Sequence, residues 1–366
     1  MQYLKDLKEI VNINSYTKNK VGVDKVSTYM SQWFAQLGFE NRCFERSELG
    51  NHNLYTTPKT DGIKILLLGH NDTVFPQGKF EHFSEDKEWV YGPGVCDMKG
   101  GNIVALQALR NVFKKNGKLE NIDILLVSDE ETGSDDSKLL TSKLAKEYDV
   151  CFVFEAAGEQ LEVVTARKGV GTFTIEIEGK ASHAGVRYSH GINANLEAAY
   201  KLIELTKLTN LEIGTTVNVG KILGGIGANT ISPNATLLLE LRYTKNSERD
   251  RLLNALETIT NTSYVEGTKA LLSGQIQRDV MESNIAQLDL IDKIEKITNI
   301  KLPTEERGGV SDANIVASQG VTTVDGFGPF GDGDHTIKER ALKISFEQRI
   351  ELMTKILMHH QEHKQF

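Results

Sequence analysis

The 366-residue sequence has few cysteines and no long apolar segment. Its three cysteines, Cys43, Cys96 and Cys151, have no paired spacing, which argues against disulfides and a thiolate zinc site and fits a reducing compartment. No apolar run approaches the roughly 20 residues of a membrane-spanning helix. The N-terminus alternates charged and apolar residues instead of forming the apolar core of a signal peptide. We therefore expect a soluble, cytoplasmic protein with no membrane partner.

Clusters of basic residues are also missing. The formal net charge is -8 and no block of Lys and Arg is present, so nucleic acid is not an expected partner. The glycine-rich segment 92–101 lacks the order of a phosphate-binding loop, and no dinucleotide fingerprint occurs. These absences argue against a nucleotide-dependent enzyme.

The length and the order of apolar runs predict two domains of an α/β protein. Short apolar runs at 63–69, 122–128 and 151–154 are typical of central strands covered on both faces. Helical patterns at 102–113 and 138–148 lie between them. Alternating strands and helices indicate a mostly parallel, helix-covered sheet.

From about residue 168 to 276 the rhythm changes to a βαββαβ order, which is the ferredoxin-like unit. Its expected elements are strand 171–178, helix 194–208, strands 215–222 and 235–243, helix 248–262 and strand 270–276. After it the chain returns to the first pattern, with helices at 285–297, 312–318 and 341–360 and a strand at 321–326. We therefore predict a catalytic domain at 1–167 and 277–366, with 168–276 inserted as a second domain.

Histidine and acidic residues follow the three predicted central strands in succession. They are His70, the pair Glu130-Glu131, and Glu155, with Asp97 between the first two and His335 near the C-terminus. The carboxyl ends of parallel strands are where open α/β sheets place ligand chemistry. Each cluster alone is also typical of an ordinary turn, a helix cap or a strand-end hydrogen bond. Their combination predicts a dinuclear metal site.

The residue types suggest roles within such a site. Two ions held close together need imidazole and carboxylate donors and a bridging carboxylate, for which Asp97 is the best candidate because glycines surround it. Asp72, two residues beyond His70, suits the carboxylate that fixes the tautomer of that imidazole. One of Glu130 and Glu131 can bind an ion while its neighbour faces the attacking water as general base.

Several segments resemble the zinc-dependent peptidase and deacylase family that contains aminoacylases, acetylornithine deacetylases, tripeptidases and bacterial glutamate carboxypeptidases. The resemblance runs nearly end to end and is carried by residues 69–75 (GHNDTVF), 92–101 (GPGVCDMKGG), 129–134 (DEETGS) and 179–185 (GKASHAG). Residues 308–314 (GGVSDAN) and 326–329 (GFGP) look closest to the glutamate carboxypeptidase branch.

The resemblance implies a specific set of metal ligands. One zinc ion would be held by His70, Asp97 and Glu155, the other by Asp97, Glu131 and His335, and Co²⁺ or Mn²⁺ could substitute. Glu130 would be the general base. The peptide bond between Asp97 and Met98 would be cis, which is uncommon outside proline.

The inserted domain, by the same resemblance, would serve as a lid and as a dimerisation domain. His183 would reach across a homodimer to stabilise the oxyanion, and Asn229 and Arg242 would bind substrate. The guanidinium of Arg242 suits bidentate capture of a terminal carboxylate. On a strand, an arginine is also commonly an ordinary ion-pair partner.

The activity expected from this resemblance is hydrolysis of an amide next to a free carboxylate, with release of a C-terminal residue such as glutamate. A glutamate at position 155, instead of aspartate, favours carboxypeptidases and deacylases over aminopeptidases. The substrate would be a small peptide or, in the alternative, an N-acyl amino acid. A metal-binding or peptide-binding protein without catalysis remains a further alternative, but it would be expected to lack the base Glu130.

Two departures from the family pattern bear on the site. Cys96 stands where many relatives have a small residue without a thiol, and it could be oxidised or simply pack. Asp332 and Asp334 precede His335 in an extended loop, and we expect both to be loop residues or to support the ligands from outside.

Overall fold

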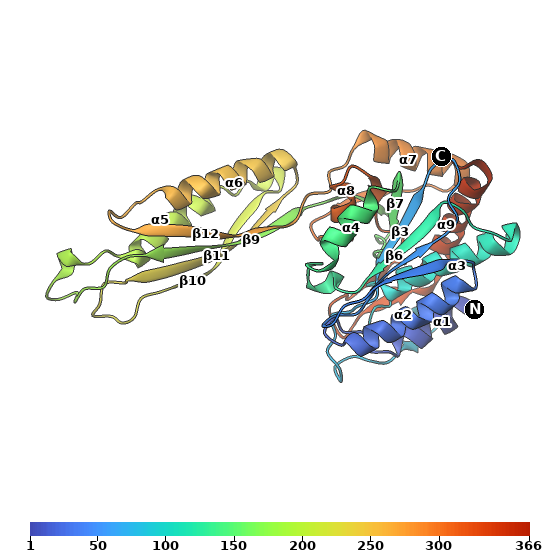
Figure 1. The fold of residues 1–366 in the computed structure, drawn as a ribbon, viewed down its shortest axis with the longest axis horizontal. Helices are drawn as coiled ribbons and strands as arrows, with labels where there is room; N and C mark the ends of the chain where they lie inside the picture. The colour runs from blue at the N-terminus through green and yellow to red at the C-terminus, as the bar shows by residue number, and fades with distance from the viewer. The chain divides into compact units, whose positions relative to one another are not determined.

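The computed structural model describes all 366 residues and contains two compact units, which we describe separately (Figure 1). Unit 1 comprises Met1–Ala166, Ser283–Arg307 and Ser311–Phe366, and unit 2 comprises Arg167–Glu282 with Gly308–Val310. The sequence predicted an insertion at 168–276. The additional segment Gly308–Val310 of unit 2 was not foreseen.

Unit 1 is built around a six-stranded sheet in the order β1-β2-β6-β3-β7-β14. Its strands are β1 (Glu40–Phe44), β2 (His52–Thr56), β3 (Ile65–His70), β6 (Ile122–Val127), β7 (Val150–Val153) and β14 (Thr322–Val324). The pairings among β6, β3, β7 and β14 are parallel, whereas β1 and β2 pair antiparallel at one edge. The predicted mostly parallel sheet is confirmed.

Burial explains which strands the sequence revealed. Every residue of β3, β6 and β7 is buried, so each strand is a nearly continuous apolar run. Strand β1 is polar and mostly exposed, and it gives no such signal.

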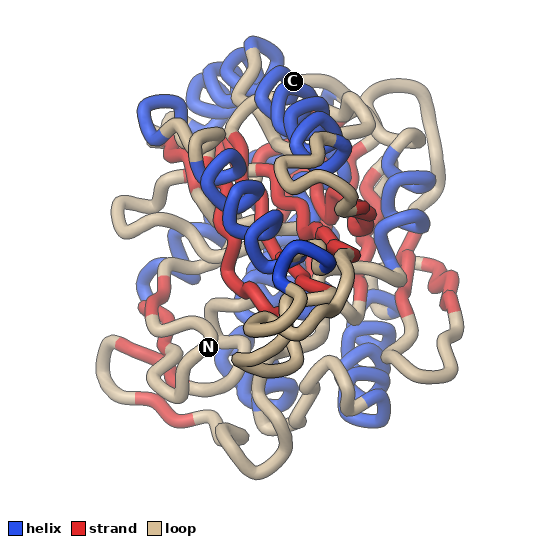
Figure 2. Tube along the Cα trace, turned by 90° about the vertical axis from the view of Figure 1, so that its left-hand side faces the viewer, coloured by secondary structure: helices blue, strands red, loops and turns tan.

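Helices cover this sheet, as Figures 1 and 2 show, and most of them contribute buried apolar side chains to its hydrophobic core. They are α1 (Gln2–Val11), α2 (Lys20–Ala35), α3 (Lys99–Asn116), α4 (Ser137–Ala145), α7 (Ile285–Thr298), α8 (Asp312–Ala317) and α9 (Lys343–His363). None of the helices has the length and apolar character needed to span a membrane.

Two small sheets complete unit 1. One has the order β15-β16-β5-β4, with β4 (Ser84–Glu85), β5 (Trp89–Tyr91), β15 (Gly331–Asp332) and β16 (Arg340–Leu342). The other pairs β8 (Val163–Arg167) with β13 (Thr304–Arg307). Most of these strands are too short to show periodicity in the sequence, and none was predicted.

Unit 2 has a separate antiparallel sheet in the order β10-β11-β9-β12, with two long helices packed on it (Figure 1). The elements are β9 (Gly169–Glu178), α5 (Ala194–Thr206), β10 (Thr216–Gly224), β11 (Asn234–Tyr243), α6 (Asn246–Asn261) and β12 (Lys269–Arg278). Short 3₁₀ turns lie at Glu130–Thr132 (η1, in unit 1), Tyr188–His190 (η2) and Leu211–Ile213 (η3). The chain order confirms the predicted βαββαβ unit.

Candidate metal centre

Three of the predicted ligands lie at the carboxyl ends of neighbouring parallel strands. His70 is the last residue of β3, Glu131 lies in η1 after β6, and Glu155 follows β7. Because β6 and β7 both pair with β3, these side chains converge at the carboxyl ends of the central strands. Asp97 arrives from a different direction, in the loop between β5 and α3.

The first ligand group is His70, Asp97 and Glu155, whose donor atoms all lie within 4.8 Å of one another. The Nε2 atom of His70 is 3.2 Å from Oδ1 of Asp97 and 3.8 Å from Oε1 of Glu155. Only 1% of the His70 side chain is exposed. This group therefore lies deep at the end of the sheet.

The second ligand group is Asp97, Glu131 and His335. The Nε2 atom of His335 is 3.2 Å from Oδ2 of Asp97 and 3.1 Å from Oε2 of Glu131. The imidazole of His335 is 57% exposed, so this group opens toward solvent. Asp97 thus turns one carboxylate oxygen to each histidine, which is the arrangement that a bridging ligand requires.

The carboxylates of the two groups repel one another. Burial, together with the charge of Asp97, raises the pKa of Glu131 to about 8 and raises the pKa of Glu155 well above its ordinary value. Burial alone would also raise the pKa of Asp97, but hydrogen bonds from His335 and His70 outweigh it and lower that pKa. The cluster therefore favours added positive charge.

The two histidines carry much of that positive charge in the metal-free protein. Hydrogen bonds to Asp97 and Glu131 raise the pKa of His335 to about 11. Burial lowers the pKa of His70, but its bonds to Asp72 and Asp97 outweigh burial and raise it. Each group offers one imidazole, one terminal carboxylate and one oxygen of the shared Asp97, so the donor set fits two zinc ions.

Asp72 lies behind the His70 ring, as predicted for a residue that fixes its tautomer. The Nδ1 atom of His70 is 3.1 Å from the carbonyl oxygen of Asp72 and 3.3 Å from its carboxylate. The Asp72 carboxylate also accepts hydrogen bonds from the hydroxyl of Thr17 at 2.7 Å and from the backbone N–H of Glu131 at 3.2 Å. Asp72 therefore connects a ligand of one group to a ligand of the other.

Glu130 is half-buried in η1, beside Glu131. Its charge contributes to the raised pKa values of both Glu131 and Glu155, which places it close to both ligand groups. Glu130 belongs to neither ligand group, and a carboxylate so placed can exchange protons with a water molecule at the site.

Close backbone approach explains the glycines after Asp97. A Cβ atom on Gly100 would lie 2.0 Å from the carbonyl oxygen of Val95, and one on Gly101 would lie 1.9 Å from the carbonyl oxygen of Phe154. A side chain at position 100 would therefore push the start of α3 away from the loop that carries Asp97, and one at position 101 would push it away from the segment that carries Glu155. The peptide bond between Asp97 and Met98 is cis, as the resemblance implied.

The residues that departed from the family pattern are not ligands in either group. Cys96 is fully buried and burial raises the pKa of its thiol, so it packs as a neutral side chain. Asp332 forms a two-fold ion pair with Arg340, with both N–O distances at 2.9 Å. Asp334 lies exposed in the loop before His335.

The three site residues predicted for the inserted domain, His183 for the oxyanion and Asn229 and Arg242 for substrate binding, all lie in unit 2. His183 and Asn229 are exposed on adjacent loops, joined by a bridge between His183 and Thr230 and by a hydrogen bond of 2.9 Å from the Ala184 N–H to the Asn229 carbonyl oxygen. Arg242 lies on β11, away from this pair in the sequence. Their roles toward substrate stay predictions.

Arg242 is engaged within unit 2. Its Nε atom donates to the Glu240 carboxylate at 2.7 Å, and its Nη1 atom donates to the Gly308 carbonyl oxygen at 3.1 Å. The bidentate edge of its guanidinium therefore holds an internal carboxylate, the kind of group that it was predicted to capture from substrate.

Sequence reasoning missed a buried residue next to the centre. Glu339 is 1% exposed and accepts hydrogen bonds from the backbone N–H groups around Asp97. Its place four residues after His335 was the only available signal.

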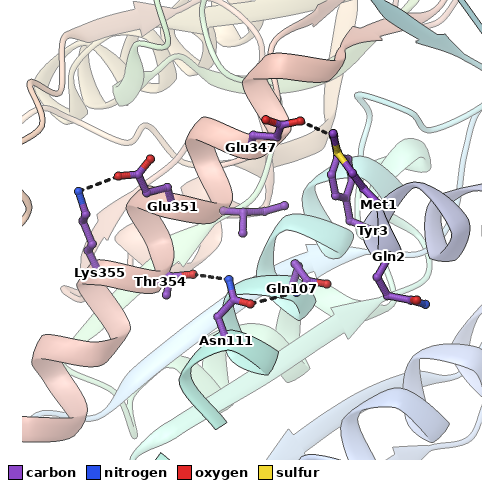
Figure 3. A pocket seen from close by; sticks show the side chains of 10 residues that line it. Met1, Gln2, Tyr3, Gln107, Asn111, Glu347, Glu351, Thr354 and Lys355 are labelled. Atoms are coloured by element: carbon purple, nitrogen blue, oxygen red, sulfur yellow. Dashed lines mark hydrogen bonds and ion pairs between the residues drawn. The ribbon is translucent and has the colours of Figure 1, made fainter. Parts of the chain in front are cut away.

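A cavity of about 490 Å³ lies elsewhere in unit 1, among α1, α3 and α9 (Figure 3). Its walls include Tyr3, Asn111 and the ion pair of Lys355 with Glu351. It shares no residue with either ligand group, so it is not part of the candidate centre.

Comparison with known proteins supports the metal-site interpretation. The model of the peptidase family M20/M25/M40 matches residues 66–359. The chain is 28% identical over 369 residues to carboxypeptidase G2 from Pseudomonas sp. (strain RS-16), and the match covers 97% of this chain and 88% of that protein.

Solved structures with the same fold cover nearly the whole chain. The aminopeptidase PepT from Bacillus cereus ATCC 10987 has a TM-score of 0.79 at 21% identity and covers 97% of both chains. The YXEP protein from Bacillus subtilis, described as a dinuclear metal binding peptidase from the M20 family, has a TM-score of 0.71 at 12% identity and covers 99% of this chain and 98% of that one. At these identities the likeness shows a shared fold.

Proposed function

Starting from the fact that this chain belongs to peptidase family M20/M25/M40 and is a metallohydrolase, we propose that it is a dizinc carboxypeptidase that releases a C-terminal glutamate or a similar residue. The observation that carries the dinuclear site is the position of Asp97, whose two carboxylate oxygens each lie 3.2 Å from a different histidine. Glu155 and the similarity to carboxypeptidase G2 along 97% of the chain support the carboxypeptidase activity.

The chemistry divides between the metal ions and the side chains around them. Two bound zinc ions would lower the pKa of water and polarise the scissile carbonyl. His70, Asp97 and Glu155 would hold one ion, and Asp97, Glu131 and His335 the other. Asp72 would keep the His70 ring in the tautomer whose Nε2 atom is free to coordinate.

Glu130 would move the protons. Its carboxylate would take a proton from the attacking water and then give it to the nitrogen of the leaving amino acid. His183 would donate a hydrogen bond to the oxyanion that forms on the scissile carbonyl, and Asn229 would hold the substrate beside it. The substrate's free carboxylate would bind Arg242, in place of Glu240 or alongside it.

The partner that completes this site would be a second copy of the chain. Unit 2 exposes apolar side chains along α5, where Ile203 is 51% exposed, and on the edge strand β10, where Leu223 is 56% exposed. A homodimer through this face would bury them and could present His183 to the other subunit. Sedimentation should show a dimer that Ile203→Glu dissociates, and a monomeric wild-type protein would contradict this arrangement.

The cell compartment is a further part of the proposal. All three cysteines are free, and two of them are buried, which fits the reducing cytoplasm. Cell fractionation should recover the protein with cytoplasmic markers.

The decisive substrate test compares three classes on the zinc-loaded protein. Xaa-Glu and Xaa-Asp dipeptides should have a higher kcat/KM than N-acetyl amino acids. Turnover of N-acetyl amino acids alone would assign the same machinery to a deacylase instead. Binding of these substrates without turnover by metal-loaded protein would indicate a binding protein and contradict catalysis.

A further inference from the structure

The loop that carries Asp97 wraps around a buried carboxylate. Glu339 is 1% exposed, and its Oε2 atom accepts a hydrogen bond of 3.0 Å from the Gly94 N–H. Its Oε1 atom accepts bonds of 3.0 Å and 3.1 Å from the N–H groups of Cys96 and Asp97. One side chain therefore satisfies three backbone donors within four consecutive residues.

We propose that Glu339 is a positioning residue that fixes Asp97 between His70 and His335, so that one carboxylate can bridge two metal ions. This proposal rests on the dinuclear site of the proposed function. Glu339 touches neither an ion nor substrate in this assignment. It acts through the backbone of the ligand that both ions share.

The backbone around Glu339 is tied to both ligand loops. His335 lies in a tight turn closed by a hydrogen bond of 3.0 Å from the Thr336 N–H to the Gly333 carbonyl oxygen, and a second turn, closed by a bond of 3.1 Å from the Glu339 N–H to the Thr336 carbonyl oxygen, leads to Glu339. The next residue begins β16, which pairs with β5 just before the Asp97 loop. The two ligand loops therefore extend from adjacent strands of the small sheet, and the Glu339 side chain spans the gap between them.

Burying a carboxylate is energetically unfavourable for a side chain that only fills space. Removing it from water is unfavourable unless hydrogen bonds replace those of the solvent. The buried cation nearest in the sequence to this loop, Lys99, attracts Glu339 through its charge but donates its hydrogen bonds to the carbonyl oxygens of Ile10 and Ile13. The hydrogen bonds to the Glu339 carboxylate therefore come from the amides of the Asp97 loop, and these bonds hold the loop in place.

The position of these bonds links Glu339 to metal binding. Donation from the Asp97 N–H restrains the backbone that directs the Asp97 carboxylate, whose Oδ1 and Oδ2 atoms must reach different ions. Loss of this restraint would let the carboxylate rotate toward one histidine. Outer-shell partners of metal ligands typically change metal affinity by about 10- to 100-fold when they are mutated.

The test is Glu339→Gln, with Zn²⁺ or Co²⁺ alone as the probe. The amide retains one acceptor but turns an NH₂ group toward a backbone N–H. We expect affinity for at least one of the two ions to fall about 10- to 100-fold. We also expect an altered visible absorption spectrum of the Co²⁺ protein, and a lower kcat with little change in KM.

Asp123→Asn is the matched control. Asp123 is also 1% exposed and accepts hydrogen bonds from the Thr57 N–H at 2.9 Å and the Tyr148 hydroxyl at 2.6 Å, but it lies near the amino end of β6. The Asp123→Asn substitution should reduce the unfolding temperature without changing metal affinity or the Co²⁺ spectrum. A second variant, Glu339→Asp, retains the charge but is one methylene shorter, and it should give an intermediate metal affinity. It also tests the proposal if Glu339→Gln does not fold.

Two failures are distinguishable. Wild-type protein that does not bind two ions would overturn both the proposed function and the role of Glu339. Wild-type protein with two ions, together with Glu339 variants of equal affinity and unchanged Co²⁺ spectrum, would overturn only the role of Glu339.

Discussion

The candidate residues of the two units are held in different ways. In unit 1, His70 is buried and hydrogen-bonded from behind, and Asp97 is fixed by both histidines and by backbone contacts to Glu339. In unit 2, His183 and Asn229 are exposed on loops. The metal-binding geometry is therefore built within one unit before any ligand arrives, whereas substrate contacts depend on exposed groups. Metal binding and substrate recognition should separate in mutants.

The strongest test of this separation is Asp97→Ala. It removes the only donor common to both ligand groups, so both ions should be lost and activity should fall to the background level. Metal content by mass spectrometry and peptide hydrolysis measure the two effects. A variant that kept two ions would show that Asp97 is not the bridge.

Glu130→Gln should separate catalysis from metal binding within unit 1. Loss of a general base typically lowers kcat by about 10²- to 10⁴-fold. Zinc content should stay at two ions per subunit, because Glu130 belongs to neither ligand group. Full turnover by the zinc-loaded variant would refute its role as base.

His183→Ala tests the contribution of unit 2. Removal of one oxyanion donor should lower kcat by about 10²- to 10³-fold without any change in metal content. His190→Ala, in an exposed turn of the same unit, is the matched control and should keep wild-type activity. Loss of zinc from His183→Ala would break the proposed division between the units.

Metal affinity should also depend on pH, and substitutions in unit 2 should not alter that dependence. The pKa of His335 is about 11 and that of Glu131 about 8 in the metal-free protein, so both groups are mostly protonated at pH 7. Zinc must displace these protons, and its affinity should rise from pH 6 to pH 8, by up to about tenfold per pH unit for each proton released. Calorimetry in buffers of different ionisation enthalpy counts those protons. An affinity independent of pH over this range would contradict the electrostatics described for the site.

The sequence revealed those parts of the molecule in which one physical requirement dominates. Strands β3, β6 and β7 are buried on both faces and must be apolar, so their runs were visible and their polar ends marked the site. The edge strand β1 and its antiparallel neighbour β2 were missed because polar residues and short length hide their periodicity.

Contacts between distant segments were harder to predict. Glu339 looks like a surface acid in the sequence, and only its bond to the N–H of Asp97, 242 residues earlier, shows its place in the centre. The assignment of Gly308–Val310 to unit 2 likewise depends on backbone contacts such as the bond from Arg242 to Gly308. The roles of individual ligands came from a family resemblance, because spacing alone left Glu130 and Glu131 interchangeable.

The most direct test of the central claim is anomalous diffraction at the zinc edge from crystals of the zinc-loaded protein. The account predicts two peaks about 3.5–4 Å apart, each in contact with one oxygen of Asp97. A single peak, or two peaks of which Asp97 touches at most one, would contradict it.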